Sequence, residues 1–274
     1  MKRTLSLIAL VCVVGVAARA QDPNDAEREF RRLLTRDDEL MAKRPEPRQR
    51  QSVERLGHDY QRFLAQHPGH TRAMIAYGSL LDDLGRGDEA MRWWEKAITF
   101  DPHAAAAYNN IANHYGHTGR AVDALRYYAK AIALAPDEPM FRFNWAVTCS
   151  LFRNDTRAVY GWDTAEIFRR SLAQLRAARD MAPLEFSYAK AYAEEFYLVP
   201  QPDWTEARVA WKVCLGLTSD DEQRQLVYCH LARVSIRMKD AEEARLWLTK
   251  VESAQFEPQR RALERQIAQL DADR

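Results

Sequence analysis

The sequence predicts an all-α solenoid of helical hairpins that stack one after another along the chain. The main observation is a repeat with a period of thirty-four residues, in which Gly85, Ala90, Trp94, Ala97 and Pro102 recur as Gly119, Ala124, Tyr128, Ala131 and Pro136. A fixed period of this length is typical of stacked hairpins, because one hairpin cannot bury its own apolar face. Arrays of this kind usually bind other molecules, so the repeat indicates peptide or protein binding.

The first twenty residues have the pattern of a secretory signal peptide. Two basic residues follow Met1, residues 5–16 are apolar, and Ala18-Arg19-Ala20 has the form of a small-x-small cleavage site. The apolar run is shorter than the roughly 20 residues that a membrane span needs. We therefore expect cleavage near Ala20 and an exported chain, periplasmic or secreted, with no stable membrane span. A membrane anchor and a lipid on Cys12 are the alternatives.

The net charge bears on the class of partner, and the cysteine count bears on disulfide bonding. The formal net charge is +1, and loss of residues 1–20, which carry three basic residues and no acid, brings it to −2. No long-range positive field then attracts nucleic acid, so we expect no nucleic-acid partner. Three cysteines remain, an odd number that makes no disulfide framework. We expect buried free thiols, and a Cys214–Cys229 bridge is the alternative that export permits.

Two helices are predicted before the clear repeats. Residues 24–42 carry a rough apolar stripe at helical spacing, and the prolines of residues 44–47 end that helix because neither can continue it. A second helix is expected from about 50 to 66. Its predicted inner face consists of Leu56, Tyr60, Phe63 and Leu64.

Residues 71–104 and 105–138 are the two clear units. Each has small residues at its eighth, twentieth and twenty-seventh positions and a proline at its thirty-second, namely Gly78, Ala90, Ala97 and Pro102, then Ala112, Ala124, Ala131 and Pro136. Small residues let paired helices approach closely. Gly85 and Gly119 lie at the turn within each hairpin, where a positive φ favours glycine. This pattern resembles the tetratricopeptide repeat family, and the resemblance implies a right-handed α-solenoid.

The remainder of the chain keeps parts of the pattern. Degenerate units are predicted at residues 139–183, 184–220 and 225–256, with a capping helix at 258–271. An insertion around residues 153–166, which holds Trp162, is either an extension of the third hairpin or a binding flap. We assign residues 21–50 to an N-terminal helix and linker, and residues 51–274 to the solenoid.

The resemblance implies that the first helix of each hairpin lines a concave, ligand-binding face. Six positions of that helix supply most contacts in the family. Carried over by position, they are Asn109, Asn110, Asn113 and His117, then Met140, Phe143, Asn144, Val147 and Leu151, then Tyr188, Tyr192 and Glu195, and finally Cys229, Arg233, Ile236 and Arg237. The predicted peptide-binding set is Asn109, Asn110, Asn113, Phe143, Asn144, Val147, Tyr188, Tyr192, Arg233 and Arg237.

Asn110 and Asn144 occupy the sixth position of successive units. A primary amide both donates and accepts hydrogen bonds, so this pair is expected to bind a peptide backbone through side chains that lack partners within the fold. The alternative is that these amides bond neighbouring helices or water.

Apolar and basic side chains complete the predicted face. Phe143, Val147, Tyr188 and Tyr192 would form an apolar middle to the groove, or else belong to the core. Arg233 and Arg237 lie one turn apart and would receive a carboxylate, or else form a solvated face.

Signals for catalysis are weak. The sequence has no phosphate loop, nucleotide fingerprint or nucleophile elbow, and His114 and His117 lack a third ligand at a convincing spacing. We predict no catalytic residue, no metal and no cofactor, and a non-catalytic protein- or peptide-binding scaffold outside the cytoplasm. The alternatives are a structural subunit of an envelope assembly that docks by its convex face or termini, and an enzyme with an unrecognised site.

Overall fold

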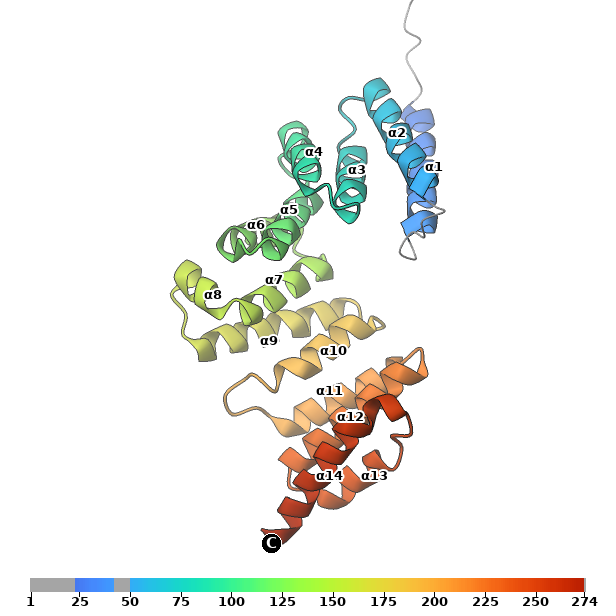
Figure 1. Cartoon of the computed structure of the whole chain (residues 1–274). Coiled ribbons are helices and arrows are strands. Elements are labelled where there is room, and N and C mark those ends of the chain that lie inside the picture. The colour runs from blue at the N-terminus through green and yellow to red at the C-terminus, as the bar shows by residue number, and fades with distance from the viewer. Residues whose placement is uncertain (1–22, 42–49, 274) are drawn as a thin grey trace, which may run out of the picture. The chain divides into compact units, whose positions relative to one another are not determined.

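The computed structural model describes residues 23–41 and 50–273, and the regular structure in these ranges is helical throughout (Figure 1). The predicted signal peptide and the prolines of residues 44–47 lie outside the described residues. Within the described ranges, no helix combines the length and apolarity needed to cross a membrane. The chain divides after Ala73 into two compact units.

The first unit contains α1 (Pro23–Met41), α2 (Arg50–Gln66) and the start of α3 (Thr71–Asp83). Helix α1 packs on α2, and Phe30 of α1 is 1% exposed. The predicted inner face of α2 is confirmed, because all four of its residues are buried. The hydroxyl of Tyr60 donates to Asp37 Oδ2 at 2.8 Å, and the rings of Phe30 and Phe63 contact the ring of His70.

The second unit begins at Met74, so it contains the two clear repeats apart from residues 71–73, and the degenerate units that follow them. Its helices after α3 are α4 (Gly87–Phe100), α5 (Ala105–His117), α6 (Ala121–Leu134), α7 (Pro139–Leu151), α8 (Arg153–Tyr160), α9 (Thr164–Met181), α10 (Phe186–Glu195), α11 (Trp204–Leu217), α12 (Asp221–Arg237), α13 (Ala241–Leu248) and α14 (Glu257–Ala272), with a short 3₁₀ helix at Ala254–Phe256. From α4 to α13 each helix packs on the next, and α7 also pairs with α9 across the inserted α8. This arrangement is an all-α solenoid of hairpins, closed by α14 on α12 and α13.

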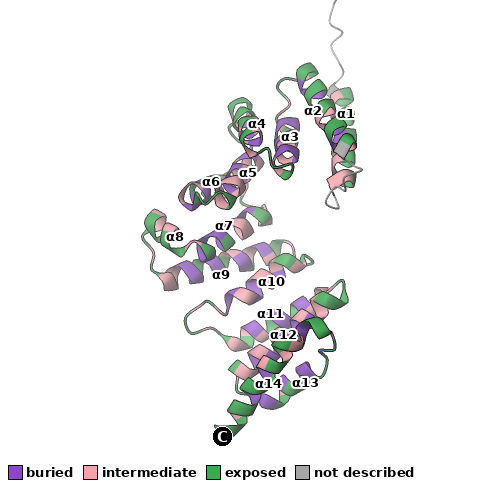
Figure 2. Cartoon of the chain, in the orientation of Figure 1, coloured by how far each residue is buried: buried purple, intermediate pink, exposed green. Residues whose placement is uncertain are grey.

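The small residues at the predicted positions are buried. Figure 2 colours the buried residues of each helix purple. Ala90, Ala97, Ala112 and Ala124 are 0% exposed. A Cβ atom on Gly78 would lie 2.4 Å from Nε1 of Trp94, and that indole nitrogen donates to the carbonyl of Ile75 at 3.2 Å. A side chain at residue 78 would therefore push α3 and α4 apart.

The turns within three hairpins share one backbone geometry. Gly85 and Gly119 have φ of 74° and 79°, which confirms the predicted positive φ. In each turn the following N–H bonds a carbonyl five residues back, from Arg86 to Leu81 and from Arg120 to Tyr115, both at 2.8 Å. The fifth unit repeats this bond from Asp240 to Ser235 at 2.9 Å, and there Lys239 holds φ at 63°.

The insertion in the third unit is a packed helix. Helix α8 contacts α6, α7 and α9. Trp145 Nε1 donates to the hydroxyl of Tyr160 at 3.0 Å, and the rings of Tyr160 and Trp162 stack at 4.3 Å. These contacts favour an extension of the hairpin over a binding flap.

The three described cysteines are free and buried, so the structure contains no Cys214–Cys229 bridge. Burial raises the pKa of the Cys149 and Cys214 thiols to about 12. Neither thiol therefore ionises near neutral pH, which fits a packing role.

Candidate functional site

Asparagine side chains link the first helices of three successive hairpins. Asn110 Nδ2 donates to Ser79 Oγ at 3.0 Å, and Asn144 Nδ2 donates to Asn109 Oδ1 at 3.0 Å. A longer contact of 3.4 Å runs from Asn109 Nδ2 to Asn110 Oδ1. The amides thus form a chain of hydrogen bonds from α3 through α5 to α7.

This chain corrects two expectations from the sequence. Peptide-backbone binding by Asn110 and Asn144 required side chains without partners within the fold, and the structure shows the alternative, because both amides donate to neighbouring helices. Asn109 was expected to contact a peptide, but it is 0% exposed. The physical reason is that adjacent first helices lie close enough for an amide on one to reach a polar side chain on the previous one.

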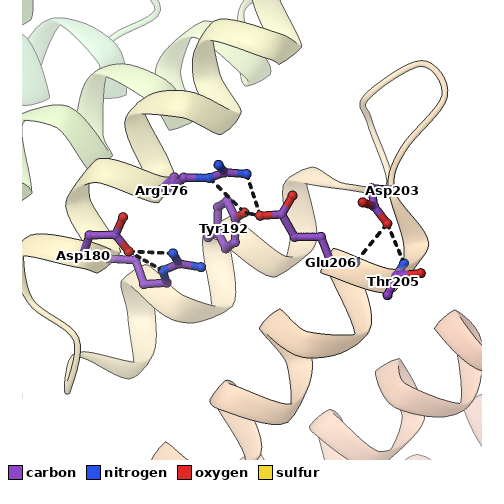
Figure 3. Close-up of polar contacts among 7 residues, drawn as sticks. Arg176, Asp180, Tyr192, Asp203, Thr205 and Glu206 are labelled. Atoms are coloured by element: carbon purple, nitrogen blue, oxygen red, sulfur yellow. Dashed lines mark hydrogen bonds and ion pairs between the residues drawn. The ribbon is translucent and has the colours of Figure 1, made fainter.

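Tyr192 is a further correction, because its side chain is 0% exposed. Figure 3 shows its hydroxyl between the guanidinium of Arg176 and the carboxylate of Glu206. Arg176 Nε donates to the tyrosine oxygen at 3.2 Å, the hydroxyl donates to Glu206, and Arg179 lies 4.3 Å from the ring centroid. Burial raises the pKa of Tyr192. This residue joins α9, α10 and α11 and does not face a ligand.

The same junction is fixed at the start of α11. Asp203 Oδ1 accepts from the backbone N–H groups of Thr205 at 2.8 Å and Glu206 at 3.1 Å (Figure 3). An aspartate at this cap position satisfies backbone donors that have no partner inside the helix. The cap therefore holds Glu206 in the first turn, where its carboxylate meets Arg176 and Tyr192.

Two cavities lie along α7 and share Val147 and Leu151. The α5–α7 cavity has a volume of about 190 Å³ and is lined by Asn113, Gly116, His117, Tyr128, Phe143, Asn144, Val147, Thr148, Leu151 and Phe152. The α7–α10 cavity has a volume of about 280 Å³ and is lined by Val147, Ser150, Leu151, Arg153, Leu175, Ala191, Glu194, Glu195 and Leu198. Val147 is 39% exposed and Leu151 is 67% exposed, so apolar surface is accessible where the cavities meet.

The structure brings together part of the predicted set. Four of its members line the α5–α7 cavity, namely Asn113, Phe143, Asn144 and Val147. The ring of Tyr188 on α10 lies 5.1 Å from the ring of Phe143. Asn113 Oδ1 accepts a hydrogen bond from Tyr128 at 2.6 Å, so its oxygen is already engaged.

Arg233 and Arg237 line neither cavity. Arg233 lies 5.6 Å from the ring centroid of Tyr197, and Arg237 lies 5.9 Å from that of Trp204. Both guanidinium groups thus contact aromatic rings that flank the turn between α10 and α11.

Glu195 is a buried carboxylate in the wall of the α7–α10 cavity. It is 5% exposed, and Ser150 Oγ donates to its Oε1 at 2.6 Å. Burial raises its pKa to about 7, although the bond from Ser150 acts in the opposite direction. The position of Glu195 in its helix makes it a candidate in the sequence, but the sequence carries no signal of its burial, and the predicted peptide-binding set does not include it.

The described part of the chain holds no group of three or more His, Cys, Asp or Glu side chains arranged to bind a metal ion. His114 instead contacts Asp82, with 3.1 Å between Nδ1 and Oδ1. His117 lines the α5–α7 cavity. The two histidines thus have different neighbours: His114 contacts Asp82, and His117 lines the α5–α7 cavity.

Comparisons with known proteins identify the repeat. Residues 71–103 and 105–138 match the family model of the tetratricopeptide repeat. No curated protein matches the sequence.

Solved structures share the fold. PilF of Pseudomonas aeruginosa is 12% identical, with 91% of this chain and all of that chain covered and a TM-score of 0.63. PilW, described as a type IV pilus biogenesis factor, is 14% identical, with 88% and 99% covered and a TM-score of 0.62. YrrB, described as a repeat protein with an unusual peptide-binding site, is 14% identical, with 70% and 90% covered and a TM-score of 0.55. Likeness at this identity shows the fold alone.

Proposed function

Because the chain is a tetratricopeptide-repeat protein, we propose that it is a non-catalytic scaffold that binds a protein or peptide outside the cytoplasm. Stacked hairpins create extended surfaces that such proteins use for binding. The binding face consists of the first helices α5, α7 and α10, and the signal-peptide pattern of residues 1–20 supports the location.

The observation that carries this proposal is the accessible apolar surface where the two cavities meet. Val147, Leu151 and Leu198 are 39%, 67% and 43% exposed, and all three line the α7–α10 cavity. An apolar side chain of a partner that covered them would gain about 0.8 kcal/mol for each buried CH₂ group. The Phe143–Tyr188 pair lies beside this surface and extends it with aromatic area.

The corrected asparagines alter how a partner is held. Asn109, Asn110 and Asn144 already bond one another and Ser79, so backbone binding by an amide ladder does not supply the affinity. Apolar anchoring along α7 supplies it instead. Among relatives of this fold, YrrB is described as having a peptide-binding site, which supports a peptide as the class of ligand.

A displayed library of random twelve-residue peptides tests the proposal. Wild-type protein is expected to enrich a family of sequences, and Leu151→Lys is expected to lose them, because a charge would replace exposed apolar surface. The matched control is Leu246→Lys on α13, where the leucine is 64% exposed. Peptides that bound Leu151→Lys as tightly as wild type would contradict binding at α7.

A second function is favoured by apolar side chains on the second helices. Val209 and Val213, one turn apart on α11, are 57% and 41% exposed, and Leu246 on α13 is also exposed. These side chains suit a structural subunit that docks by its convex face. In that case Val209→Lys and Leu246→Lys would release the protein from its assembly, and Leu151→Lys would not.

A further inference from the structure

Glu195 presents a carboxylate that the fold leaves incompletely paired. Its side chain is 5% exposed, and Ser150 is its hydrogen-bond partner, through Oε1. Oε2 has no hydrogen-bond partner among the described residues, and this oxygen is not fully enclosed by the protein. The second oxygen is therefore reached from the α7–α10 cavity, whose wall Glu195 forms.

The neighbouring charges do not neutralise this carboxylate. Arg153 on α8 lines the same cavity, but its Nη1 donates to the carbonyl of Ser150 at 3.0 Å and its guanidinium lies 5.7 Å from the Phe168 ring. Glu194 is paired with Lys190 at 2.8 Å. Within the described chain no basic side chain forms an ion pair with Glu195.

The remaining groups around Glu195 carry no charge that would compensate it. Helix α7 contributes the hydroxyl of Ser150 and the nearby thiol of Cys149, which is neutral because burial raises its pKa. Helix α9 contributes the apolar Leu175 to the cavity. Burying an ionised carboxylate without a partner is costly, so a cation that entered the cavity would be bound favourably.

The walls of the cavity fit a specific kind of side chain. Val147, Leu151, Ala191 and Leu198 are apolar, and the volume of about 280 Å³ lies near the lower end of ligand pockets, which begin at about 300 Å³. This space suits one long side chain. Lysine and arginine combine an apolar methylene stem with a terminal cation, as this cavity requires.

We propose that the α7–α10 cavity binds one lysine or arginine side chain of the partner, with its methylene groups against Val147, Leu151 and Leu198 and its cation at Glu195 Oε2. This inference rests on the proposed function and names the chemistry of the partner at that site. It makes Glu195 a specificity-determining residue, because an apolar side chain of equal length would leave the carboxylate unpaired.

Small amino-acid probes test the cavity without knowledge of the partner. N-acetyl-lysine methylamide and N-acetyl-norleucine methylamide differ by one terminal ammonium group. Each is titrated into the full protein with labelled leucine and valine methyl groups, at pH 8, where Glu195 is ionised because its pKa is about 7. The lysine probe is expected to shift the methyl signals of Val147, Leu151 and Leu198 with an affinity about tenfold higher, the gain of one charge-assisted hydrogen bond.

Substitutions of glutamate by glutamine, which is similar in size, test whether the Glu195 carboxylate causes the preference for lysine. Glu195→Gln keeps the shape and removes the charge, and it is expected to abolish the preference for lysine. Glu95→Gln on the exposed face of α4 is the matched control and is expected to keep it. Equal binding of the two probes, no binding of either, or a preference that survived Glu195→Gln would overturn the inference. Equal binding of N-acetyl-glutamine methylamide would also overturn it, because the site would then select a neutral donor.

The outcome is separable from that of the proposed function. A peptide library that enriched apolar sequences without a basic position would support binding at α7 and contradict the role of Glu195. A library that enriched nothing would contradict the proposed function, while the lysine probe would still decide the chemistry of the cavity.

Discussion

Asn144 on α7 donates its side-chain amide to Oδ1 of Asn109 on α5, at 3.0 Å, and Asn109 is 0% exposed. The bond therefore joins the first helices of two successive hairpins at a buried point. Because it engages the amide nitrogen of Asn144 and the amide oxygen of Asn109, it contributes to the stability of the array.

Asn144→Ala is expected to lower the free energy of unfolding by about 1–3 kcal/mol, since it leaves a buried acceptor without its donor. Chemical denaturation measures this change. Asn154→Ala is the control: this asparagine is exposed on α8, and exposed substitutions usually stay within about ±0.5 kcal/mol. A variant of Asn144 with unchanged stability and weakened peptide binding would return this residue to the binding face.

Lys239→Asn is expected to raise the free energy of unfolding by about 0.5–1 kcal/mol. Lys239 holds a φ of 63°, a conformation that costs most L-residues about 1–2 kcal/mol and that asparagine tolerates better. The converse change, Gly119→Ala, is expected to destabilise the protein, because Gly119 has a φ of 79°. A Cβ there would meet no atom within 4 Å, so the loss of stability would report backbone strain and not a steric clash. If both changes left the denaturation midpoint unaltered, backbone strain at this turn would not matter.

The stability of the protein is expected to depend on pH through two buried groups of opposite sign. Burial raises the pKa of Glu195 from 4.5 to about 7, so its contribution to stability is fully present below about pH 4.5 and is lost as the pH rises through 7. Burial lowers the pKa of His230 from 6.5 to about 3, so protonation destabilises the fold as the pH falls from 6.5 towards 3. His230 stacks on Trp211 at 3.9 Å, in agreement with a neutral ring.

Glu195→Gln separates the two effects. Between pH 4.5 and 6.5 they oppose each other in the wild type, whereas the variant retains only the histidine dependence. Its free energy of unfolding is therefore expected to increase with pH by roughly 2–3 kcal/mol more than that of the wild type, at about 1.4 kcal/mol per pKa unit. Denaturation curves at these two pH values measure this difference, and parallel pH dependences would show that Glu195 titrates normally.

Export is expected to remove residues 1–20, so that the mature chain begins at Gln21. The basis is the positive start, the apolar run and the small residues before the cleavage point. Intact-mass measurement of protein from the producing cells checks this, with a variant of Ala18 and Ala20 to bulky residues as a control for cleavage. Retention of Met1 or a lipid on Cys12 would contradict it.

The sequence predicted the features that depend on local chemistry. A small residue at a helix contact and a glycine at a left-handed turn are fixed by sterics within one hairpin, and Ala124 and Gly119 lie as expected. The turn at Lys239 was missed because its geometry repeats while its residue type does not. The hydrogen bond from Asp240 to Ser235 reveals that turn.

The candidate site was harder to predict, because exposure depends on contacts between hairpins. Helical position placed Tyr192 and Val147 at the same register of successive units, yet the first is 0% and the second 39% exposed. The difference arises from Arg176 and Glu206 on α9 and α11, which bond the tyrosine hydroxyl. Such partners lie sixteen and fourteen residues away, and a repeat pattern carries no signal of them.

Site-specific photo-crosslinking in the producing cells tests the central claim most directly. A benzophenone side chain replaces Leu151, in the α7–α10 cavity, or Val209, on α11, the second helix of its hairpin. Binding along α7 predicts a crosslinked partner from position 151 and little product from position 209. Mass spectrometry is expected to map the crosslink to one segment of the partner, and a library-selected peptide is expected to displace that partner. Crosslinks from position 209 together with none from position 151 would contradict binding along α7 and favour docking by the convex face.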